Sequence, residues 1–126
     1  IDLGAVVGGY AADISDTLLV GMVPDRIRQA RRLVARVRRR CTKMVKDGVQ
    51  ADRVHAQAVA LLESAGVAHA FVHSLGHGVG IDVHEGPSIA SESRDTLRRG
   101  MVVTIEPGLY FPGIGGVRLE SMLFVQ

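Results

Sequence analysis

Two helical segments that follow one another directly, with a β-hairpin pattern on each side, constrain the fold of this chain more than any other feature. Residues 1–20 have the pattern of two strands joined by Gly8 and Gly9, a pair typical of a two-residue hairpin turn. Residues 101–125 repeat the strand pattern around a loop at 112–116 that contains one proline and three glycines. This order predicts an α+β fold in which helices cover one face of an antiparallel sheet.

The helical segments have limits that the sequence marks. The first begins at Pro24, because proline is tolerated in the first turn of a helix, and Gly48 is its predicted end. The apolar residues that recur along it at helical spacing are Ile27, Ala30, Val34, Val37, Cys41, Met44 and Val45. The second segment spans residues 51–64 and stops at Gly66. Its apolar face is formed by Val54, Ala58, Leu61 and Leu62.

The composition narrows the class of protein. With 126 residues, of which 47% are hydrophobic and 22% charged, the chain fits one globular unit. No stretch approaches the ~18 uncharged apolar residues of a membrane-spanning helix, and there is no secretory signal pattern. A single cysteine, Cys41, excludes an internal disulfide and indicates a reducing compartment, which predicts a cytoplasmic protein with no membrane partner. Both ends fall inside strand-like patterns, so we expect a fragment of a longer polypeptide.

The first hairpin carries two acids on one face. With the turn at Gly8 and Gly9, Asp2 faces Ser15 across the ladder, and Asp13 is a diagonal neighbour of Asp2 within ~7–8 Å. Carboxylates that are half-buried in a sheet are costly unless they are paired. Exposed acids on a solvated face are the ordinary explanation, but a cation between them is the alternative that we favour.

The second hairpin repeats this arrangement. A turn centred on Gly113 places Glu106 directly opposite Glu120, with Cβ atoms ~4.5–5.5 Å apart. The residues on either side of the two glutamates are too apolar for a freely solvated strand. Two like charges in such surroundings again favour a bound metal ion.

Histidines lie close to these acids in the sequence. The stretch 73–87 holds three of the five histidines, His73, His77 and His84, among four glycines and near Asp82 and Glu85. Carboxylates combined with imidazole suit Mn, Co, Zn or Fe(II) better than a thiolate site would. Four or five such ligands can hold two ions ~3.5–4 Å apart, an arrangement that activates water for hydrolysis.

Three stretches together resemble a known family: "DLGAVVGGYAADIS", "HSLGHGVGIDVHEGP" and "GMVVTIEPGLYFPGIGGVRLE". They are similar to the pita-bread metallopeptidases, the group of methionine aminopeptidases and Xaa-Pro peptidases, and most similar to the Xaa-Pro dipeptidase or aminopeptidase P branch. The resemblance implies a pita-bread (creatinase/aminopeptidase-like) fold, with residues 1–126 as the C-terminal part of the catalytic domain, truncated at both ends. The metal ligands that it implies are Asp2, Asp13, His77, Glu106 and Glu120.

The resemblance also implies an activity. The protein would cleave the bond between an N-terminal residue and a following proline, using a hydroxide activated by two divalent ions, manganese or cobalt first and zinc or iron as alternatives. Glu106 would bind metal and transfer the proton of the water, and His73 and His84 would contact the scissile carbonyl or the oxyanion. Arg118 would orient a substrate carboxylate, with a charge-partner role for the glutamates as the alternative. The implied partner is a peptide with proline in second position.

Some residues depart from the family pattern. Asp16 stands where an arginine is common, and Ser121 replaces an acid, so both changes touch the surroundings of the ligands. The first half of the family's catalytic domain is missing, so we expect a chain with every metal ligand but part of the pocket. A non-catalytic binding or scaffold module of the same fold is therefore the alternative function. Exposed sheet edges also make a homodimer one expectation.

The basic residues are concentrated in one helix. Ten of the fifteen Lys and Arg lie between Arg26 and Lys46, which raises nucleic-acid binding as a third hypothesis. The apolar stripe of that helix indicates a solvated basic face over a buried one, and no aromatic residues interleave to stack bases. We therefore predict no nucleic-acid partner. His55 and His69 match no motif and are predicted to be hydrogen-bonded residues of the core.

Overall fold

The computed structural model describes all residues 1–126 and contains two α-helices, one 3-10 helix and eight strands. The strands are β1 (Asp2–Val7), β2 (Tyr10–Ser15), β3 (Gly76–Gly78), β4 (Glu85–Ile89), β5 (Val102–Ile105), β6 (Gly108–Phe111), β7 (Gly115–Arg118) and β8 (Ser121–Phe124). The helices are α1 (Asp25–Thr42), α2 (Ala51–Glu63) and the 3-10 helix η1 (Ala68–Ala70). Neither α-helix has the length and apolar character needed to cross a membrane.

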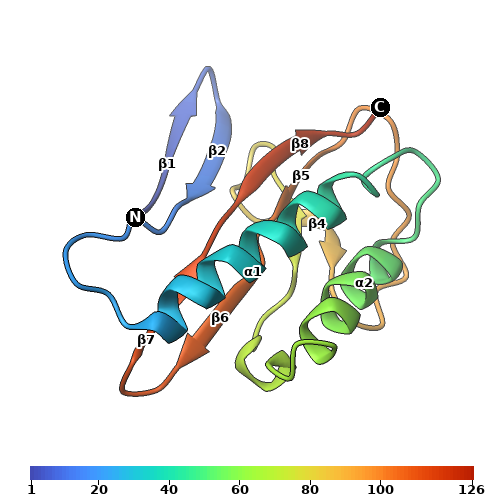
Figure 1. Cartoon of the computed structure of the whole chain (residues 1–126). Helices are drawn as coiled ribbons and strands as arrows, with labels where there is room; N and C mark the ends of the chain where they lie inside the picture. Colours follow the sequence, from blue (N-terminus) through green and yellow to red (C-terminus); the bar gives the residue numbers. More distant parts are fainter.

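The strands form three antiparallel sheets. The central sheet has the order β4-β3-β5-β8, and β1-β2 and β6-β7 are two-stranded. Both helices lie on the same side of the strands that follow them, and the β1–β2 hairpin stands beside this body (Figure 1). The predicted α+β class, with helices covering one face of a sheet, is confirmed.

The helices bury the apolar residues that the periodicity selects. Ile27, Ala30, Val34, Val37 and Cys41 of α1 are all buried, in one cluster that also includes residues of α2 and of the sheet. Burial of such aliphatic side chains is the main stabilising contribution to the domain, at about 1.5–3 kcal/mol each. The helices are therefore held by their apolar stripes against the sheet.

The end of α1 differs from the prediction. The helix stops at Thr42, because the next backbone amides, of Met44 and Val45, bond three residues back and close turns instead of a further helical turn. Gly48 lies beyond, with a positive φ of 81°. Helix α2 ends at Glu63, one residue before the predicted limit, which lies within the usual uncertainty of helix ends.

The first hairpin has the predicted register. Asp2 pairs with Ser15 and Gly4 with Asp13 in an unbroken ladder. Gly8 and Gly9 have φ values of 60° and 86°, the positive values that a type I′ turn requires. The face predicted for the two acids is therefore confirmed.

The second hairpin keeps the predicted register but is interrupted. Ile105 pairs with Ser121 in one ladder and Gly108 with Arg118 in another, and between them only the N–H of Leu119 bonds across, to the carbonyl of Pro107 at 3.4 Å. Glu106 and Glu120 lie in this gap, where the unchanged register on both sides keeps them opposite each other, although they belong to neither ladder. Pro107 follows Glu106 and has no N–H to donate, which favours a break at this point.

Candidate metal centre

Four of the expected ligand residues converge where β2, β3, β5 and β8 approach one another. Asp13 belongs to β2 and His77 to β3, while Glu106 follows β5 and Glu120 precedes β8. Two overlapping groups have ligand atoms within 4.8 Å of one another. They are Asp13, His77 and His84, and His77, Glu106 and Glu120.

The backbone explains how the two glutamates reach this place. The N–H of Glu106 donates to the carbonyl of Leu75 at 2.8 Å, and the N–H of Glu120 donates to the carbonyl of Ser15 at 2.9 Å. Each glutamate is thus bonded to a different neighbouring segment instead of to the other. These bonds join the hairpin on one side to the segment that leads to His77 and on the other side to the strand that holds Asp13.

His77 is at the centre of the site. Its Nδ1 lies 2.9 Å from the carbonyl oxygen of Gly78, and because a carbonyl only accepts, Nδ1 carries the proton. Nε2 lies 3.2 Å from Oε1 of Glu106 and 3.6 Å from Oδ2 of Asp13. The hydrogen bond with Glu106 raises the pKa of His77, and burial opposes this shift. A ring held in this way presents Nε2 as a metal-ligating atom does.

Glu120 provides the test of whether a cation fits. Its side chain is buried, with the residue 4% exposed, and Oε1 has no hydrogen-bond partner. Burial raises the pKa of Glu120 to about 7, a hydrogen bond with Ser15 opposes the shift, and the charges of Asp13 and Glu106 add to it. An unpaired oxygen among other carboxylates is unfavourable without a cation. The donor set of carboxylates and one imidazole therefore fits a divalent metal ion.

Asp2 is the expected ligand that the structure leaves outside both groups. It is exposed, and its carboxylate forms an ion pair with the guanidinium of Arg118. The diagonal placement of Asp2 and Asp13 holds in the backbone register. The side chain of Asp2 therefore lies at the edge of the site in this conformation.

Arg118 connects the metal-binding groups to a hydroxyl network. It donates from Nε to Oγ of Ser15 at 3.2 Å and from NH1 to the hydroxyl of Tyr110 at 2.9 Å. Its Nε also lies 4.0 Å from Oε2 of Glu106. Arg118 thus lies beside acids of the site, as expected of a charge partner, and its role toward a substrate stays a prediction.

Tyr110 is a residue that the sequence reasoning missed. Its hydroxyl also lies 3.1 Å from Nε2 of His73, so it joins that histidine to Arg118. The predicted register contained the signal, because Arg118 faces Gly108, and Tyr110, two residues further, is on the same face. Thr104 was missed in the same way and donates from Oγ1 to Glu106 at 3.3 Å.

The other two histidines of the stretch 73–87 occupy different places. The His84 ring lies 4.2 Å from the ring of His77, and His84 is exposed and within reach of a metal ion bound at Asp13. His73 lies outside both groups and is held by Ser74 and Tyr110. The structure therefore brings His84 into the metal-binding groups and leaves His73 beside them.

The histidines without a motif differ from each other. His55 packs against Phe71 with ring centroids 5.6 Å apart, and burial lowers the pKa of His55. His69 is exposed in the middle of η1, so the prediction of a core histidine is wrong for it. The three-residue helix η1 buries Ala70, and its other side, which carries His69, faces solvent.

Asp16, the acid at the position where arginine is common, turns away from the site. It accepts a hydrogen bond from the N–H of Thr17 at 2.7 Å and lies 3.6 Å from the guanidinium of Arg31. Its charge is therefore paired with the basic helix. The reversal of charge at this position leaves the metal-binding groups intact.

Comparisons with known proteins agree with this geometry. The sequence profile of metallopeptidase family M24 matches residues 1–126. A Xaa-Pro dipeptidase of Pyrococcus furiosus is 38% identical over 125 residues, which are 99% of this chain and 36% of that protein. This chain thus spans about a third of the length of that relative.

Solved structures show the same similarity in three dimensions. A prolidase from Pyrococcus furiosus has a TM-score of 0.96 at 38% identity, covering 99% of this chain and 37% of that chain. An X-Pro aminopeptidase from Thermotoga maritima has a TM-score of 0.93 at 34% identity, covering 98% of this chain and 35% of that chain. The expected pita-bread fold is confirmed by these neighbours. The chain belongs to metallopeptidase family M24.

Proposed function

We propose that this chain supplies the metal-binding part of a Xaa-Pro peptidase, which hydrolyses the bond between an N-terminal residue and a following proline. The observation that carries the proposal is the buried, unpartnered Oε1 of Glu120 beside His77 and Glu106. The substrate class is supported by the relatives named Xaa-Pro dipeptidase and X-Pro aminopeptidase.

The proposed ligand set has five residues, Asp2, Asp13, His77, Glu106 and Glu120. Two divalent ions are proposed, manganese or cobalt, because an oxygen-rich set with one imidazole suits them. When bound, such ions lower the pKa of water and supply hydroxide near neutral pH. To join the set, Asp2 has to exchange its ion pair with Arg118 for the metal.

Glu106 is proposed to handle the proton. Its Oε1 accepts from Thr104, and its Oε2 faces the guanidinium of Arg118, so the carboxylate is oriented from two sides. A carboxylate held in this way can accept a proton from water and return it to the leaving amine. Arg118 and Thr104 are then positioning residues for this transfer.

The two histidines beside the metal-binding groups are proposed to contact the substrate. His84 is exposed next to His77, and His73 is held by Ser74 and Tyr110. An imidazole N–H can donate to the scissile carbonyl as negative charge develops on its oxygen. Arg118, bonded to Tyr110, is proposed to orient the substrate carboxylate.

A cytoplasmic setting and a homodimer complete the proposal. The only cysteine, Cys41, is free and buried, and the absence of a disulfide is usual in a reducing compartment. Strand β1 offers an exposed edge with apolar residues such as Val6 and Val7, at which a second copy can pair.

Metal content and hydrolysis measured on the same samples test the function. We expect about two ions per chain after addition of Mn or Co, by elemental analysis, and cleavage of a Xaa-Pro dipeptide or a longer Xaa-Pro peptide. Glu120→Gln should lower metal affinity by at least about 10–100-fold, the loss that removal of a mere hydrogen-bond partner of a ligand already causes. Glu63→Gln, an exposed glutamate at the end of α2, is the matched control and should leave the affinity unchanged.

Each outcome has a distinct meaning. Ions bound without cleavage support the metal site and direct the assay to a longer chain that contains the remaining two thirds of the relatives' length. If no ion binds with either metal, the proposed enzymatic function is contradicted, and a binding or scaffold module of the same fold is favoured.

A further inference from the structure

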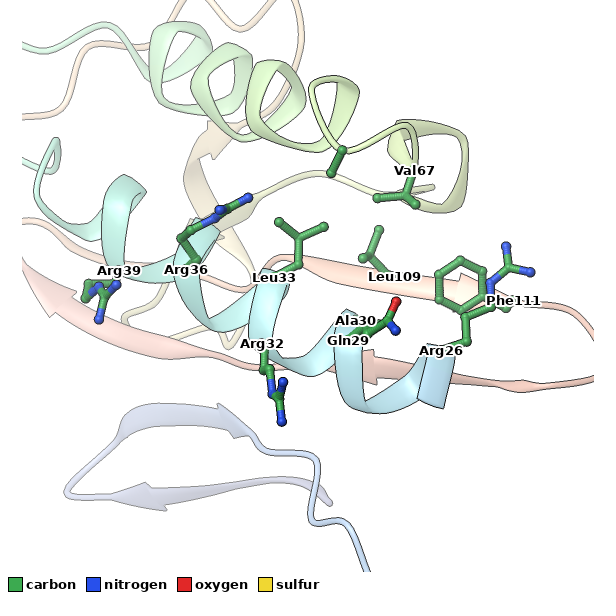
Figure 2. Close-up of a pocket in the computed structure, with 11 residues that line it drawn as sticks. Arg26, Gln29, Ala30, Arg32, Leu33, Arg36, Arg39, Val67, Leu109 and Phe111 are labelled. Carbon is green, nitrogen blue, oxygen red and sulfur yellow. The ribbon is translucent and has the colours of Figure 1, made fainter. Parts of the chain in front are cut away.

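A groove lies on the side of α1 that faces away from the β1–β2 hairpin. It is open, has a volume of about 890 Å³, and runs between α1 and the loop that follows α2 (Figure 2). Leu33, Val67, Leu109 and Phe111 provide its apolar lining. The groove thus combines side chains from α1, β6 and the loop before η1.

The charges around this groove have one sign. Arg26, Arg32, Arg36 and Arg39 line it, and none of its lining residues is acidic. No ion pair involves any of these four arginines, whereas Arg28 and Arg31 outside the groove pair with aspartates. The groove therefore has unbalanced positive charge beside an apolar floor.

The sequence of α1 accentuates this imbalance. From Arg26 to Lys46 there are ten basic residues and no acidic one. Arg32 and Arg36 are four residues apart, as are Arg36 and Arg40, and like charges at this spacing destabilise a helix. A helix face that is merely solvated usually mixes both signs. An anionic partner would relieve this repulsion.

Two arginines define the length of a matching ligand. Arg26 and Arg36 are ten residues apart on α1, which corresponds to ~15 Å along the helix axis. The guanidinium of Arg26 lies over the ring of Phe111 at 4.2 Å from its centroid, which holds this charge at one end of the groove. An extended peptide covers ~3.3 Å per residue, so carboxylates about four or five residues apart match both ends.

We propose that this groove binds an acidic segment of a partner protein, with carboxylates at Arg26 and Arg36 and apolar side chains between them. The aliphatic surface of Leu33, Val67 and Leu109 suits such side chains. It does not suit nucleic acid, because the one aromatic ring, Phe111, is buried and already covered by Arg26. The site lies outside the metal-binding groups and is independent of the peptidase activity.

A synthetic peptide tests the proposal. The probe is a fluorescent peptide with two pairs of glutamates that flank two leucines, and its binding to the protein is followed by fluorescence anisotropy at about 0.15 M salt. We expect the double variant Arg26→Glu, Arg36→Glu to weaken binding by about tenfold or more, because two charge-assisted contacts are lost. The neutral pair Arg26→Gln, Arg36→Gln serves if the first variant does not fold, as judged by circular dichroism.

Matched controls separate this site from general attraction of charge. Arg53→Glu, Arg94→Glu makes the same change of charge at exposed positions outside the groove and should change affinity less than about twofold. Replacing the two leucines of the peptide by alanine should also weaken binding. Equal losses in the two double variants, or no saturable binding by the peptide, would overturn the proposal. Tighter binding of a single-stranded oligonucleotide of equal charge at the same arginines would overturn it in favour of nucleic acid.

Discussion

The two acidic hairpins have the same kind of sequence but place their carboxylates in different ways. In the β1–β2 hairpin the ladder is continuous from Asp2 to Val7, and every residue of β1 is exposed. In the second hairpin the ladder is interrupted at Glu106 and Glu120, and most of the surrounding strand residues are buried or half-buried. Only the interrupted hairpin contributes both of its acids to one group of ligand atoms.

The difference shows what the neighbours of a hairpin contribute. In the β1–β2 hairpin, Asp2 ends in an ion pair with Arg118 at the edge of the site. In the second hairpin the amides of Glu106 and Glu120 point outward, as in a non-hydrogen-bonded pair of an antiparallel ladder, and bond to Leu75 and Ser15. Convergence of ligands here follows from pairing with a neighbouring segment on each side of the hairpin.

The largest expected effect sharpens the contrast in burial. Ile105→Ala, in the buried hairpin, removes a side chain that is 0% exposed and should lower the free energy of unfolding by about 2–5 kcal/mol. Ile14→Ala, in the first hairpin, affects a residue that is 53% exposed and should change it by less than about 0.5 kcal/mol. Urea unfolding followed by circular dichroism measures both. A similar loss at the two positions would contradict the exposure of Ile14 and of the β1–β2 hairpin in this chain.

The pH dependence of stability is the next effect in size. Glu120 has an ordinary pKa of 4.5 when the chain is unfolded and a pKa of about 7 in the fold, so the Glu120 carboxyl keeps its proton to a higher pH in the folded protein. Without metal, the protein should therefore lose about 3 kcal/mol of stability as the pH rises from 4.5 to 7. The raised pKa of His77 acts in the same direction, with a contribution that is lost as the pH rises above its ordinary value.

Variants and metal separate the contribution of Glu120. Urea unfolding in the presence of a chelator should show a flatter pH profile for Glu120→Gln, while Glu63→Gln keeps the profile of the parent protein. A saturating divalent ion should also remove the loss, because it stabilises the ionised carboxylate. A profile unchanged by Glu120→Gln would show that this carboxylate is ionised at low pH and already paired.

The smallest effect concerns the turns, in which the two hairpins are alike. Gly9 has a φ of +86° and Gly113 a φ of +73°, and an added Cβ would meet no atom within 4 Å at either position. Alanine at each should cost about 1 kcal/mol through backbone strain alone. Gly8→Asn should be nearly neutral, because asparagine tolerates positive φ. Thermal unfolding of the three variants measures these losses of stability. Unequal losses for alanine at Gly9 and Gly113 would show that one turn has contacts that the other lacks.

Local sequence signals predicted much of the fold. The glycine pair at 8–9 determined the register of the first hairpin, and the apolar spacing of 27–41 identified the buried face of α1. These features depend on residues close in sequence. The register of the second hairpin was also predictable from its turn, on both sides of the break.

The position of the two glutamates against the other ligands could not be predicted in the same way. It depends on the carbonyls of Leu75 and Ser15, which are distant in sequence from the glutamates that bond to them. The position of the Asp2 side chain likewise depends on Arg118, more than a hundred residues away. Sequence therefore indicated which residues belong to the site, while their convergence depends on long-range hydrogen bonds.

The attachment of the β1–β2 hairpin has a practical consequence for protein engineering. The hairpin is bonded to the rest of the chain along β2, through Ala11 to Gly80, Asp13 to Met122 and Ser15 to Glu120. Its tip at Gly8 and Gly9 is exposed and lies ~13 Å along the strand from the level of Asp13. Exposed loop tips tolerate insertion well, so this tip is a suitable position for a fluorescent label or an inserted reporter domain that leaves the carboxylates in place.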